Sequence, residues 1–365
     1  MSMKFLFEFP RYHTNNVGMV DALVADGHQV VFSVTRQSPI ENHSGITPVL
    51  QKQSIVSKFL SSCLRQNPAV LPFYCPSIFS HFRFLWESDF NIAVVRSPLR
   101  LIALMTLFYC FIFRRKVLFY SQSVVQKDQY LSKWIFRYSL AIIFRGNWIC
   151  PLFFESTDFQ KHVPFLVDFE AEDHDLRRLG KSNVLSLLVV AKSVPRKNIE
   201  TVILAVKALS DQGVGCTLTV ITEVSTPAHR HHITMLKEVV KKLKVEDIMI
   251  FKENVEHVHM REIYYTHNVF ILPSFDEPAS VSVLEALASG CIVLTSNQNG
   301  TSTYFDHGVN GYIFDPNKVE DVVSILLGLH SDERVFNLIR YNGLLNARGR
   351  TSKHIFLEKF YESIR

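Results

Sequence analysis

Short apolar strands alternate with helical segments along the chain, and this alternation restricts the possible folds more than any other feature. In the first half, the strand-like run Lys4–Phe9 precedes an expected helix over Asn15–Ala25, and the next strand covers Gln29–Val34. The pattern starts again in the second half, with a strand over Val184–Val190 and a helix over Asn198–Asp211. Strands that alternate with helices predict a parallel sheet with helices on both faces. We therefore expect two α/β domains of this kind.

The length of 365 residues also suggests two domains. We place the first over residues 1–168 and the second over residues 169–345, followed by a C-terminal segment over 346–365. The boundary falls in an acidic, polar span that ends near Asn183. The remaining strands are expected at Asn91–Arg96, Val117–Tyr120, Trp148–Phe154, Thr217–Thr222, Ile248–Phe251, Val269–Ser274, Cys291–Ser296 and Gly311–Phe314, and the remaining helices at Leu99–Phe113, Ser132–Phe144, His229–Leu243, Val258–Thr266 and Thr351–Ile364.

Composition favours a folded globular chain, because hydrophobic residues make up 47% and charged residues 20% of the sequence. The six cysteines form no C-x-x-C pair, and the neighbouring His229, His231 and His232 lack zinc spacing, so no metal site is expected. Reduced cysteines fit a cytoplasmic protein. No signal peptide is expected, since the chain opens with a strand pattern. The most apolar run, Leu101–Phe113, is too short to span a bilayer.

Positive charge is concentrated in the first half of the chain. Residues 1–165 hold 17 Lys and Arg against 9 Asp and Glu, which gives +8, and the remainder holds 22 against 25, which gives −3. Basic residues alternate there with bulky apolar ones, as in Arg83–Trp86 and Lys133–Arg137. This pattern favours peripheral contact with an anionic membrane over nucleic acid. Ordinary buried helices with basic flanks remain an equal alternative.

The segment Phe275–Gly290 carries the strongest functional signal. Glu277 and Glu285 are separated by seven residues, Ser280 is a candidate N-cap of a helix, and Gly290 ends that helix. A strand, a polar loop and a helix N-terminus together form an anion site, because the first N–H groups of the helix have no intrahelical partner. The two carboxylates can then accept hydrogen bonds from hydroxyl groups of the same ligand, and a nucleotide sugar has that makeup.

This stretch resembles the Glu-(seven residues)-Glu signature of retaining glycosyltransferases of family 4, within glycosyltransferase group 1. Val189–Asn198 looks like the strand and basic loop that open the second domain of that family. Asn299–Ser302 and Gly308–Phe314 look like its closing turn and hairpin. Ala22–Leu23 and Gly27–Val30 look like the end of its first helix and the start of its second strand. The order and spacing of these matches support the assignment.

The resemblance implies a GT-B fold, in which two Rossmann-like domains face a central cleft and the C-terminal helix crosses back to the first domain. It implies an enzyme that moves a sugar from a nucleoside-diphosphate sugar to a glycan or lipid-linked acceptor, with retention and without a metal or other cofactor. The second domain would bind the donor and the first the acceptor. Such an enzyme would serve cell-surface polysaccharide synthesis, as in lipopolysaccharide or capsule, at the inner face of the cell membrane.

The resemblance also assigns roles to residues of the second domain. Lys197 matches the diphosphate-binding lysine, Lys192 stands where arginine is usual, and Arg196 lies close enough to contribute. Glu277 matches the glutamate that contacts the donor sugar, and Glu285 the one that binds ribose. The backbone amides near Val281, Ser282 and Val283 would meet the terminal phosphate, with the hydroxyl of Ser282 in support, and Asn254 lies in the loop expected near the base. Pro278 and Ala279 replace a Gly-aromatic pair, so the donor sugar is not named.

The first domain departs further from the family pattern. Pro10 and Arg11 occupy the position of the usual Gly-Gly pair, and the following loop places His13, Asn15 and Asn16 as cleft or acceptor residues. Gln122 aligns with the family histidine, and Gln cannot act as a base, although the leaving phosphate is thought to take the acceptor proton in this family. His13 is the other candidate for that position. Two alternatives stay open: a GT-B-like nucleotide-sugar epimerase or inverting transferase, and a non-catalytic subunit that binds nucleotide sugar or scaffolds a complex.

Overall fold

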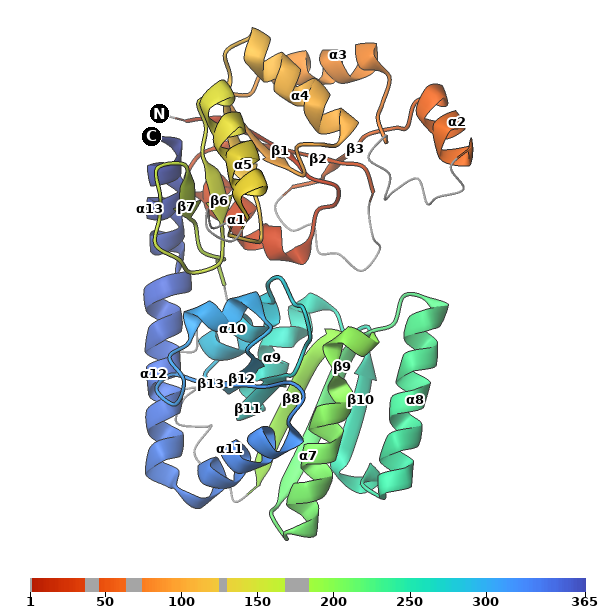
Figure 1. Ribbon diagram of the computed structural model, residues 1–365, viewed down its shortest axis with the longest axis vertical. Coiled ribbons are helices and arrows are strands. Elements are labelled where there is room, and N and C mark those ends of the chain that lie inside the picture. The colour runs from red at the N-terminus through yellow and green to blue at the C-terminus, as the bar shows by residue number, and fades with distance from the viewer. Residues whose placement is uncertain (1, 37–45, 64–73, 125–129, 168–183) are drawn as a thin grey trace. The chain divides into compact units, whose positions relative to one another are not determined.

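The computed structural model describes residues 2–36, 46–63, 74–124, 130–167 and 184–365. The chain divides into two compact units, the first made of Met1–Leu166 with Lys353–Arg365 and the second of Val167–Ser352 (Figure 1). The predicted boundary at 168/169 and its acidic span lie outside the described residues. The last helix belongs to the first unit, as the expected fold implies.

The first unit contains a seven-stranded sheet of order β3-β2-β1-β4-β5-β6-β7, in which the paired strands run parallel. The expected strands and helices are present, with ends shifted by a few residues. The short strands β3 and β7 and the helices α2 and α3 were not predicted. The elements are β1 (Lys4–Glu8), the 3-10 helix η1 (Thr14–Asn16), α1 (Val17–Ala25), β2 (Gln29–Val34), β3 (Val49–Leu50), α2 (Ile55–Cys63), α3 (Ile78–Ser88), β4 (Ile92–Arg96), α4 (Leu101–Ile112), β5 (Lys116–Tyr120), α5 (Leu131–Phe144), β6 (Trp148–Cys150), β7 (Gln160–His162) and α13 (Lys353–Ile364).

The second unit contains a six-stranded parallel sheet of order β10-β9-β8-β11-β12-β13. Its predicted elements are present, and α11 and α12 were not predicted. The elements are β8 (Leu185–Lys192), η2 (Pro195–Lys197), α7 (Ile199–Asp211), β9 (Cys216–Glu223), α8 (Pro227–Leu243), η3 (Glu246–Ile248), β10 (Met249–Glu253), η4 (His257–His259), α9 (Met260–Tyr265), β11 (Val269–Leu272), α10 (Val281–Ala288), β12 (Ile292–Ser296), η5 (Gly300–Tyr304), β13 (Tyr312–Phe314), α11 (Val319–Ser331) and α12 (Glu333–Thr351).

Strand β1 shows why an almost continuous apolar run forms the centre of a parallel sheet. Successive side chains of a strand point to opposite faces, so Phe5 and Phe7 enter one core and Leu6 enters the other. The Phe5–Phe7 core also holds residues of α1 and α13. The Leu6 core holds residues of α3, α4 and α5. Both faces of β1 are therefore buried, which fixes its register in the sheet.

In both units the strand order reverses beside the first strand, between β1 and β4 and between β8 and β11. In open α/β sheets, ligands bind beyond the carboxyl ends of the strands at such a reversal. In the second unit this position is occupied by the loops that follow β8 and β11, which carry the basic stretch and the first signature glutamate.

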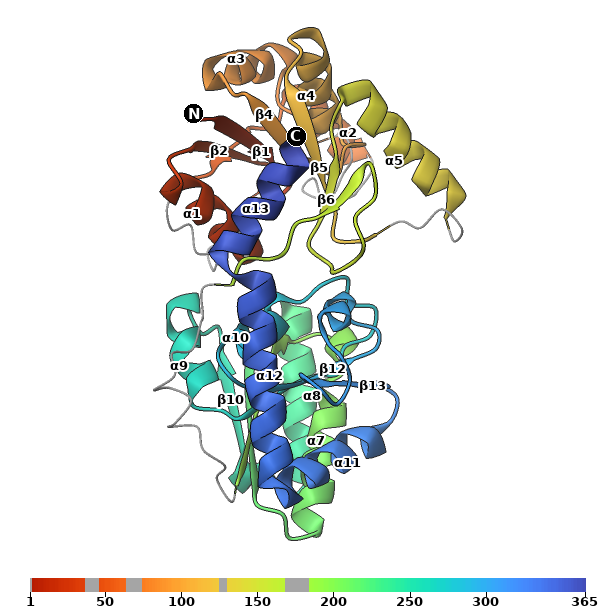
Figure 2. The ribbon, with the colours of Figure 1, turned by 90° about the vertical axis from the view of Figure 1, so that its left-hand side faces the viewer.

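The C-terminal helix α13 is bound tightly to the first unit, where Figures 1 and 2 show it next to α1. Phe360 is fully buried, and its ring meets those of Phe5 and Phe356, each with centroids 5.5 Å away. Polar contacts add to this packing, since His28 Nε2 lies 2.7 Å from the Tyr361 hydroxyl. The last helix thus completes a core that begins with the first strand.

We predict that Phe360→Ala lowers the free energy of unfolding by about 3–5 kcal/mol, because the substitution leaves a cavity among aromatic rings. Urea unfolding followed by tryptophan fluorescence measures this change, since Trp86, Trp134 and Trp148 all lie in the first unit. The control is His354→Ala on the exposed side of the same helix, which should change stability by less than about 0.5 kcal/mol. Equal effects of the two substitutions would show that α13 is not part of this core.

Candidate functional site

The basic loop after β8 and the signature loop after β11 are joined by backbone and side-chain contacts. β8 and β11 are neighbouring parallel strands, so the segments that follow them start at the same edge of the sheet. The Phe275 N–H donates to the Arg196 carbonyl at 2.8 Å. The guanidinium of Arg196 in turn donates to the carbonyls of Phe275 and Asp276, both at 3.2 Å. These contacts hold the two loops against each other.

Glu277 and Lys197 form a buried ion pair where these loops meet. Each residue is only 8% exposed, and the Lys197 ammonium donates to Glu277 Oε2. Arg196 donates to the same oxygen at 2.7 Å. Burial lowers the pKa of Lys197, the carboxylate of Glu277 opposes that effect, and the positive charges of Arg196 and Lys192 add to the lowering. One carboxylate therefore serves two cations, which leaves a positive site suited to an anion.

The backbone of Glu277 is fixed as firmly as its side chain. Its N–H donates to the Gln298 carbonyl at 3.0 Å, and its carbonyl accepts from the Gly300 N–H at 2.8 Å. Asn299, between these two, is 1% exposed, and its side chain accepts from the Thr301 N–H. The Asn299–Ser302 turn that contributed to the family resemblance thus positions the first signature glutamate.

The N-cap of α10 is Ser280, as the sequence predicts. Ser280 occupies the N-cap position, but its hydroxyl accepts no backbone N–H there and instead lies 2.9 Å from the Ser282 hydroxyl. The Ser282 hydroxyl is in contact with the Val190 carbonyl at 3.3 Å. The predicted N-cap position is therefore confirmed, although the Ser280 hydroxyl binds Ser282 instead of a backbone N–H of the helix. The first amides of α10, at residues 281–283, have no cap from Ser280 and can bind an anion.

Glu285 lies in a different set of contacts from Glu277. Its Oε1 is 3.1 Å from His257 Nε2, and its Oε2 accepts from the Tyr264 hydroxyl at 2.9 Å. The hydrogen bond to Glu285 raises the pKa of His257, against the effect of burial. His257 and Tyr264 were not predicted from the sequence, since neither belongs to a recognisable motif. They orient the Glu285 carboxylate from η4 and α9.

Two predicted donor residues have structural partners of their own. Lys192 binds Glu223 Oε2 at 2.9 Å, across the pairing of β8 with β9. Asn254 adopts φ +52° and binds Val224 twice, accepting from its N–H at 2.8 Å and donating to its carbonyl at 3.2 Å. Lys192 keeps a charge near Lys197, whereas the amide of Asn254 links the ends of β9 and β10.

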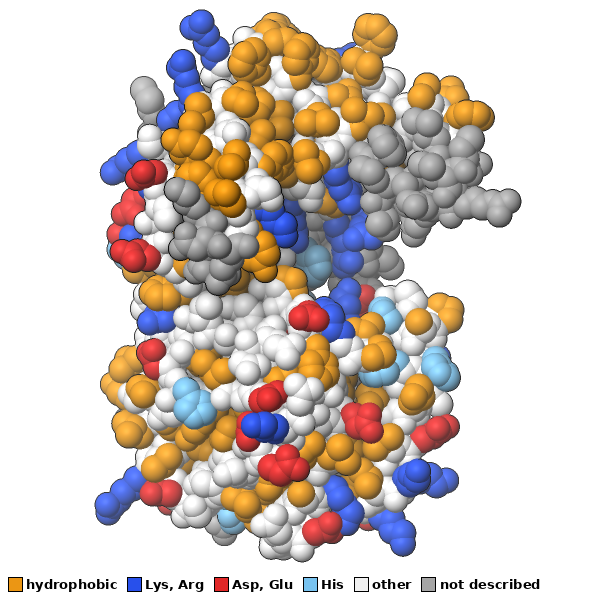
Figure 3. Space-filling view, viewed as in Figure 1, with side chains coloured by type: hydrophobic (Ala, Val, Ile, Leu, Met, Phe, Trp, Pro, Cys, Tyr) orange, Lys and Arg blue, Asp and Glu red, His pale blue; other side chains and the backbone are white. Residues whose placement is uncertain are grey.

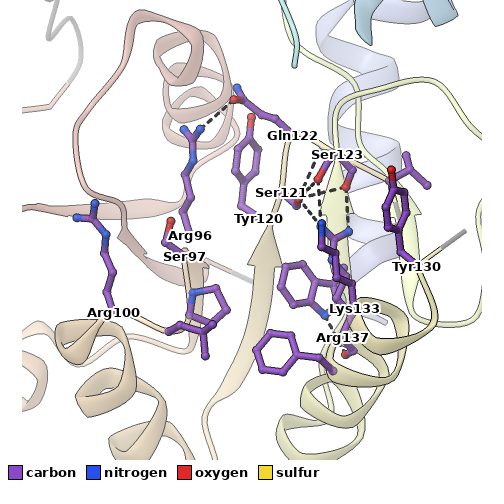
Figure 4. A pocket seen from close by; sticks show the side chains of 15 residues that line it. Arg96, Ser97, Arg100, Tyr120, Ser121, Gln122, Ser123, Tyr130, Lys133 and Arg137 are labelled. Atoms are coloured by element: carbon purple, nitrogen blue, oxygen red, sulfur yellow. Dashed lines mark hydrogen bonds between the residues drawn. The ribbon is translucent and has the colours of Figure 1, made fainter. Parts of the chain in front are cut away.

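The first-unit candidates do not form one cluster. His13 and Asn15 are half-buried and Asn16 is 1% exposed, all in the segment between β1 and α1. Gln122 instead lines a cavity of about 860 Å³ at the ends of β4 and β5, and its side-chain oxygen accepts from Arg96 at 2.9 Å (Figure 4). The described lining of this cavity includes Gln122 but not the three loop residues.

Solved structures share this fold over nearly the whole chain. A glycosyltransferase from Rickettsia africae ESF-5 matches with a TM-score of 0.75 at 14% identity, covering 99% of this chain and 97% of that one. HepE from Anabaena, solved in complex with UDP-glucose, matches with a TM-score of 0.72 at 15% identity and 99% coverage of both chains. Sucrose-phosphate synthase from Thermosynechococcus elongatus gives 0.70 at 14% identity, with 99% and 98% coverage. The chain therefore has the GT-B fold of glycosyltransferases.

A family model matches the sequence of the second unit. Residues 172–343 match the model of the family Glycosyl transferases group 1. Sucrose-phosphate synthase of Spinacia oleracea is 26% identical over 171 residues, which are 44% of this chain and 16% of the relative. Mannosylfructose-phosphate synthase of Agrobacterium fabrum is 28% identical over 116 residues, 32% of this chain and 26% of the relative. The matches thus span only 16% and 26% of the length of these two relatives.

We predict that the His257–Glu285 contact stabilises the protein most at acidic pH. The folded pKa of His257 is raised above its unfolded value, so the stabilisation is complete below the unfolded pKa of about 6.5 and is lost as the pH rises through the folded pKa. The loss of stability in His257→Gln should therefore be larger at about pH 5.5 than at about pH 8.5. Urea unfolding at both pH values measures it.

The matched control is His259→Gln, two residues away and exposed, whose effect should not change with pH in this way. A His257→Gln effect that stays constant, or grows as the pH rises, would contradict the contact.

Proposed function

We propose that this chain is a retaining glycosyltransferase that moves a sugar from a nucleoside-diphosphate sugar to a glycan or lipid-linked acceptor. The observation that carries the proposal is the buried Lys197–Glu277 pair beside the N-terminus of α10, within the region that matches the model of glycosyl transferases group 1. HepE of Anabaena was solved with UDP-glucose, which supports a nucleotide-sugar donor here.

In this proposal the basic loop and the helix N-terminus stabilise the leaving diphosphate. Negative charge grows on the diphosphate as the bond to the sugar breaks, and fixed donors aimed at that charge lower the barrier. Lys197 and Arg196 supply positive charge from one side, and the first amides of α10 supply donors from the other. Lys192 adds charge nearby. The donor phosphates would replace part of the contact that these cations now make with Glu277.

The two signature carboxylates then orient the rest of the donor. Glu277, fixed through both backbone and side chain, accepts hydrogen bonds from the sugar hydroxyls and sets the anomeric carbon opposite the acceptor. Glu285, held by His257 and Tyr264, accepts from the ribose hydroxyls. Such positioning contributes to catalysis because it removes the entropy cost of aligning the reacting atoms.

The proton of the acceptor hydroxyl passes to the leaving phosphate, which fits a retaining reaction on one face of the sugar. Gln122 cannot take a proton, and its side-chain oxygen already accepts from Arg96. We further propose that the reaction needs no metal. Within the described residues no group of three or more His, Cys, Asp or Glu side chains is placed to hold one. An Asp-His-Asp triplet at 173–175 lies outside the described residues. Turnover in the presence of a chelator tests whether the reaction needs a metal.

A large apolar surface on the first unit supports contact with an anionic membrane. Exposed apolar side chains recur at helical spacing on α4 and α5, where Figure 3 shows hydrophobic groups gathered. Exposed Arg114 and Arg145 follow the two helices and complement anionic lipid. No helix in the described part of the chain is long and apolar enough to cross a membrane. The side chains of this apolar surface are Leu104, Phe108, Phe111, Leu131, Ile135, Tyr138 and Ile142.

We therefore propose a peripheral enzyme at the inner face of the cell membrane that takes part in cell-surface polysaccharide synthesis. The donor sugar class is found by a thermal-shift panel of nucleotide sugars. A ligand that binds only the folded state raises the melting temperature, so the donor class should give the largest shift.

We predict that Lys197→Ala and Glu277→Gln each lower the transfer rate at least about 100-fold, because each removes a group that acts on the reacting donor. Turnover is measured with the donor from the thermal-shift panel, in the presence of excess chelator. The controls are Lys242→Ala and Glu238→Gln, exposed residues of the same unit, which should retain full activity.

Native turnover in either site variant would refute the assignment of the site. Strict dependence on an added divalent ion would refute the metal-free mechanism. Failure to consume any donor with any acceptor extract would favour the non-catalytic alternative.

We predict that the unmodified chain binds vesicles containing phosphatidylglycerol at low salt and is released at high salt, because exposed charges are screened. The double variant Phe108→Ser, Phe111→Ser should bind at least about tenfold more weakly, since burying each Phe side chain contributes about 1.5–3 kcal/mol. Co-sedimentation with vesicles measures binding. The control is Leu338→Ser in the second unit, which is 57% exposed like Phe108. A native chain that stays in solution with the vesicles at low salt would contradict membrane contact.

A further inference from the structure

The cavity of the first unit that contains Gln122 has a strongly positive lining. It lies at the carboxyl ends of β4 and β5 beside α5, and its volume is about 860 Å³ (Figure 4). Four cationic side chains line it, Arg96, Arg100, Lys133 and Arg137, and no Asp or Glu is among the described residues of the lining. Among the described lining residues, the positive charge of the cavity is therefore not balanced by a carboxylate.

Arg137 is the most deeply buried of these cations, with 9% of its surface exposed. Its guanidinium donates to the Ser123 carbonyl at 2.9 Å and to the Ser121 hydroxyl at 2.8 Å, and it stacks 4.5 Å from the centre of the Trp148 ring. Gln160 is a further neutral acceptor at 3.2 Å. Burial lowers the pKa of Arg137. A buried charge that meets only neutral groups is costly, so an anionic partner would stabilise it.

Arg100 and Arg96 add like charges to the same cavity. Arg100 Nη1 is buried and has no hydrogen-bond partner in the described structure. Burial lowers the pKa of Arg100, and the neighbouring charges of Arg36 and Arg96 lower it further. Arg96 donates to the neutral Gln122 and lies 5.5 Å from the centre of the Tyr120 ring. The arginines thus repel one another and remain hydrogen-bond donors for a ligand.

We propose that this cavity binds the phosphate group of a phosphorylated acceptor. A phosphate ester carries up to two charges and three free oxygens, which matches several arginines from different elements better than a carboxylate with one charge. The lining also includes the aromatic rings of Tyr130, Phe136 and Trp148, against which the remainder of the acceptor can pack. This inference rests on the proposed function only for the identity of the ligand as the acceptor.

Two sources share this chemistry, a soluble sugar phosphate and the phosphate of a lipid carrier. Both present the same group to the arginines. They differ in the group attached to the phosphate, which is a sugar in one case and a hydrocarbon chain in the other. Leu99, an apolar residue of the cavity lining, is 67% exposed. The experiment includes one arm for each source.

The test is a titration of the full chain with inorganic pyrophosphate, followed by tryptophan fluorescence. Trp148 lines the cavity and all three tryptophans belong to the first unit, so the signal reports on the first unit. We expect saturable quenching, with an apparent dissociation constant raised about tenfold or more in Arg96→Gln and Arg137→Gln. Arg83→Gln, whose side chain is 79% exposed on α3, is the control and should bind like the native chain.

Arg137→Gln removes a buried group, so Arg96→Gln and Lys133→Gln serve as the variants that leave the core intact. Native affinity in both of these variants would overturn the proposal. Equal quenching by acetate and pyrophosphate would also overturn it, because a carboxylate would then suffice. Competition by fructose 6-phosphate or by farnesyl phosphate supports the phosphate site, and the tighter competitor identifies the source.

The outcome is separable from that of the proposed function. The titration needs no donor and no turnover, and the thermal shift caused by the donor should be unchanged in Arg96→Gln. Loss of pyrophosphate binding in the variants of a chain that consumes no donor would support the phosphate site while refuting the transferase. A working transferase with native pyrophosphate affinity in Arg96→Gln and Lys133→Gln would support the transferase and refute the phosphate site.

Discussion

The contact of Lys197 and Arg196 with Glu277 is the interaction on which the geometry of the second unit's site depends. It joins the loops that follow two neighbouring strands, and it is buried, so loss of one partner leaves a poorly compensated charge at a cost of about 3–5 kcal/mol. Glu277 is also fixed by backbone hydrogen bonds to the turn around Asn299. A carboxylate held this way is oriented before any ligand arrives, and preorganised charge is more effective in catalysis than charge that must reorient.

The two proposed sites hold positive charge differently. In the second unit, Lys197 and Lys192 each have a carboxylate partner, so an anionic ligand must compete for the cations. In the first unit, Arg137 is held by neutral oxygens and an indole ring. The first arrangement favours reversible binding and release of a diphosphate. The second leaves a positive charge that an anionic ligand would neutralise. The proposed donor and acceptor sites thus follow from the same principle of charge compensation.

Much of the fold was predictable, because β-strands buried on both faces leave a clear pattern. β2 matches its expected range and β8 begins one residue later than expected, since each is an almost continuous apolar run. β3 and β7 were missed because two or three residues carry no measurable periodicity. The N-cap of α10 was predicted correctly at Ser280, and only the structure shows that its hydroxyl binds Ser282 instead of a backbone N–H. The N-cap residue can be predicted from the local sequence, whereas the partner of its side chain depends on packing.

Local patterns of residues specify the alternation of strands and helices, the seven-residue spacing of Glu277 and Glu285, and the basic loop with Lys197. Which side chains contact each other depends on the packing of the whole fold. It paired Lys192 with Glu223, placed His257 and Tyr264 on Glu285, and gathered Arg96, Arg100 and Arg137 around one cavity. These partners come from separate elements, and their proximity follows from strand order and helix packing, which no short stretch of sequence specifies.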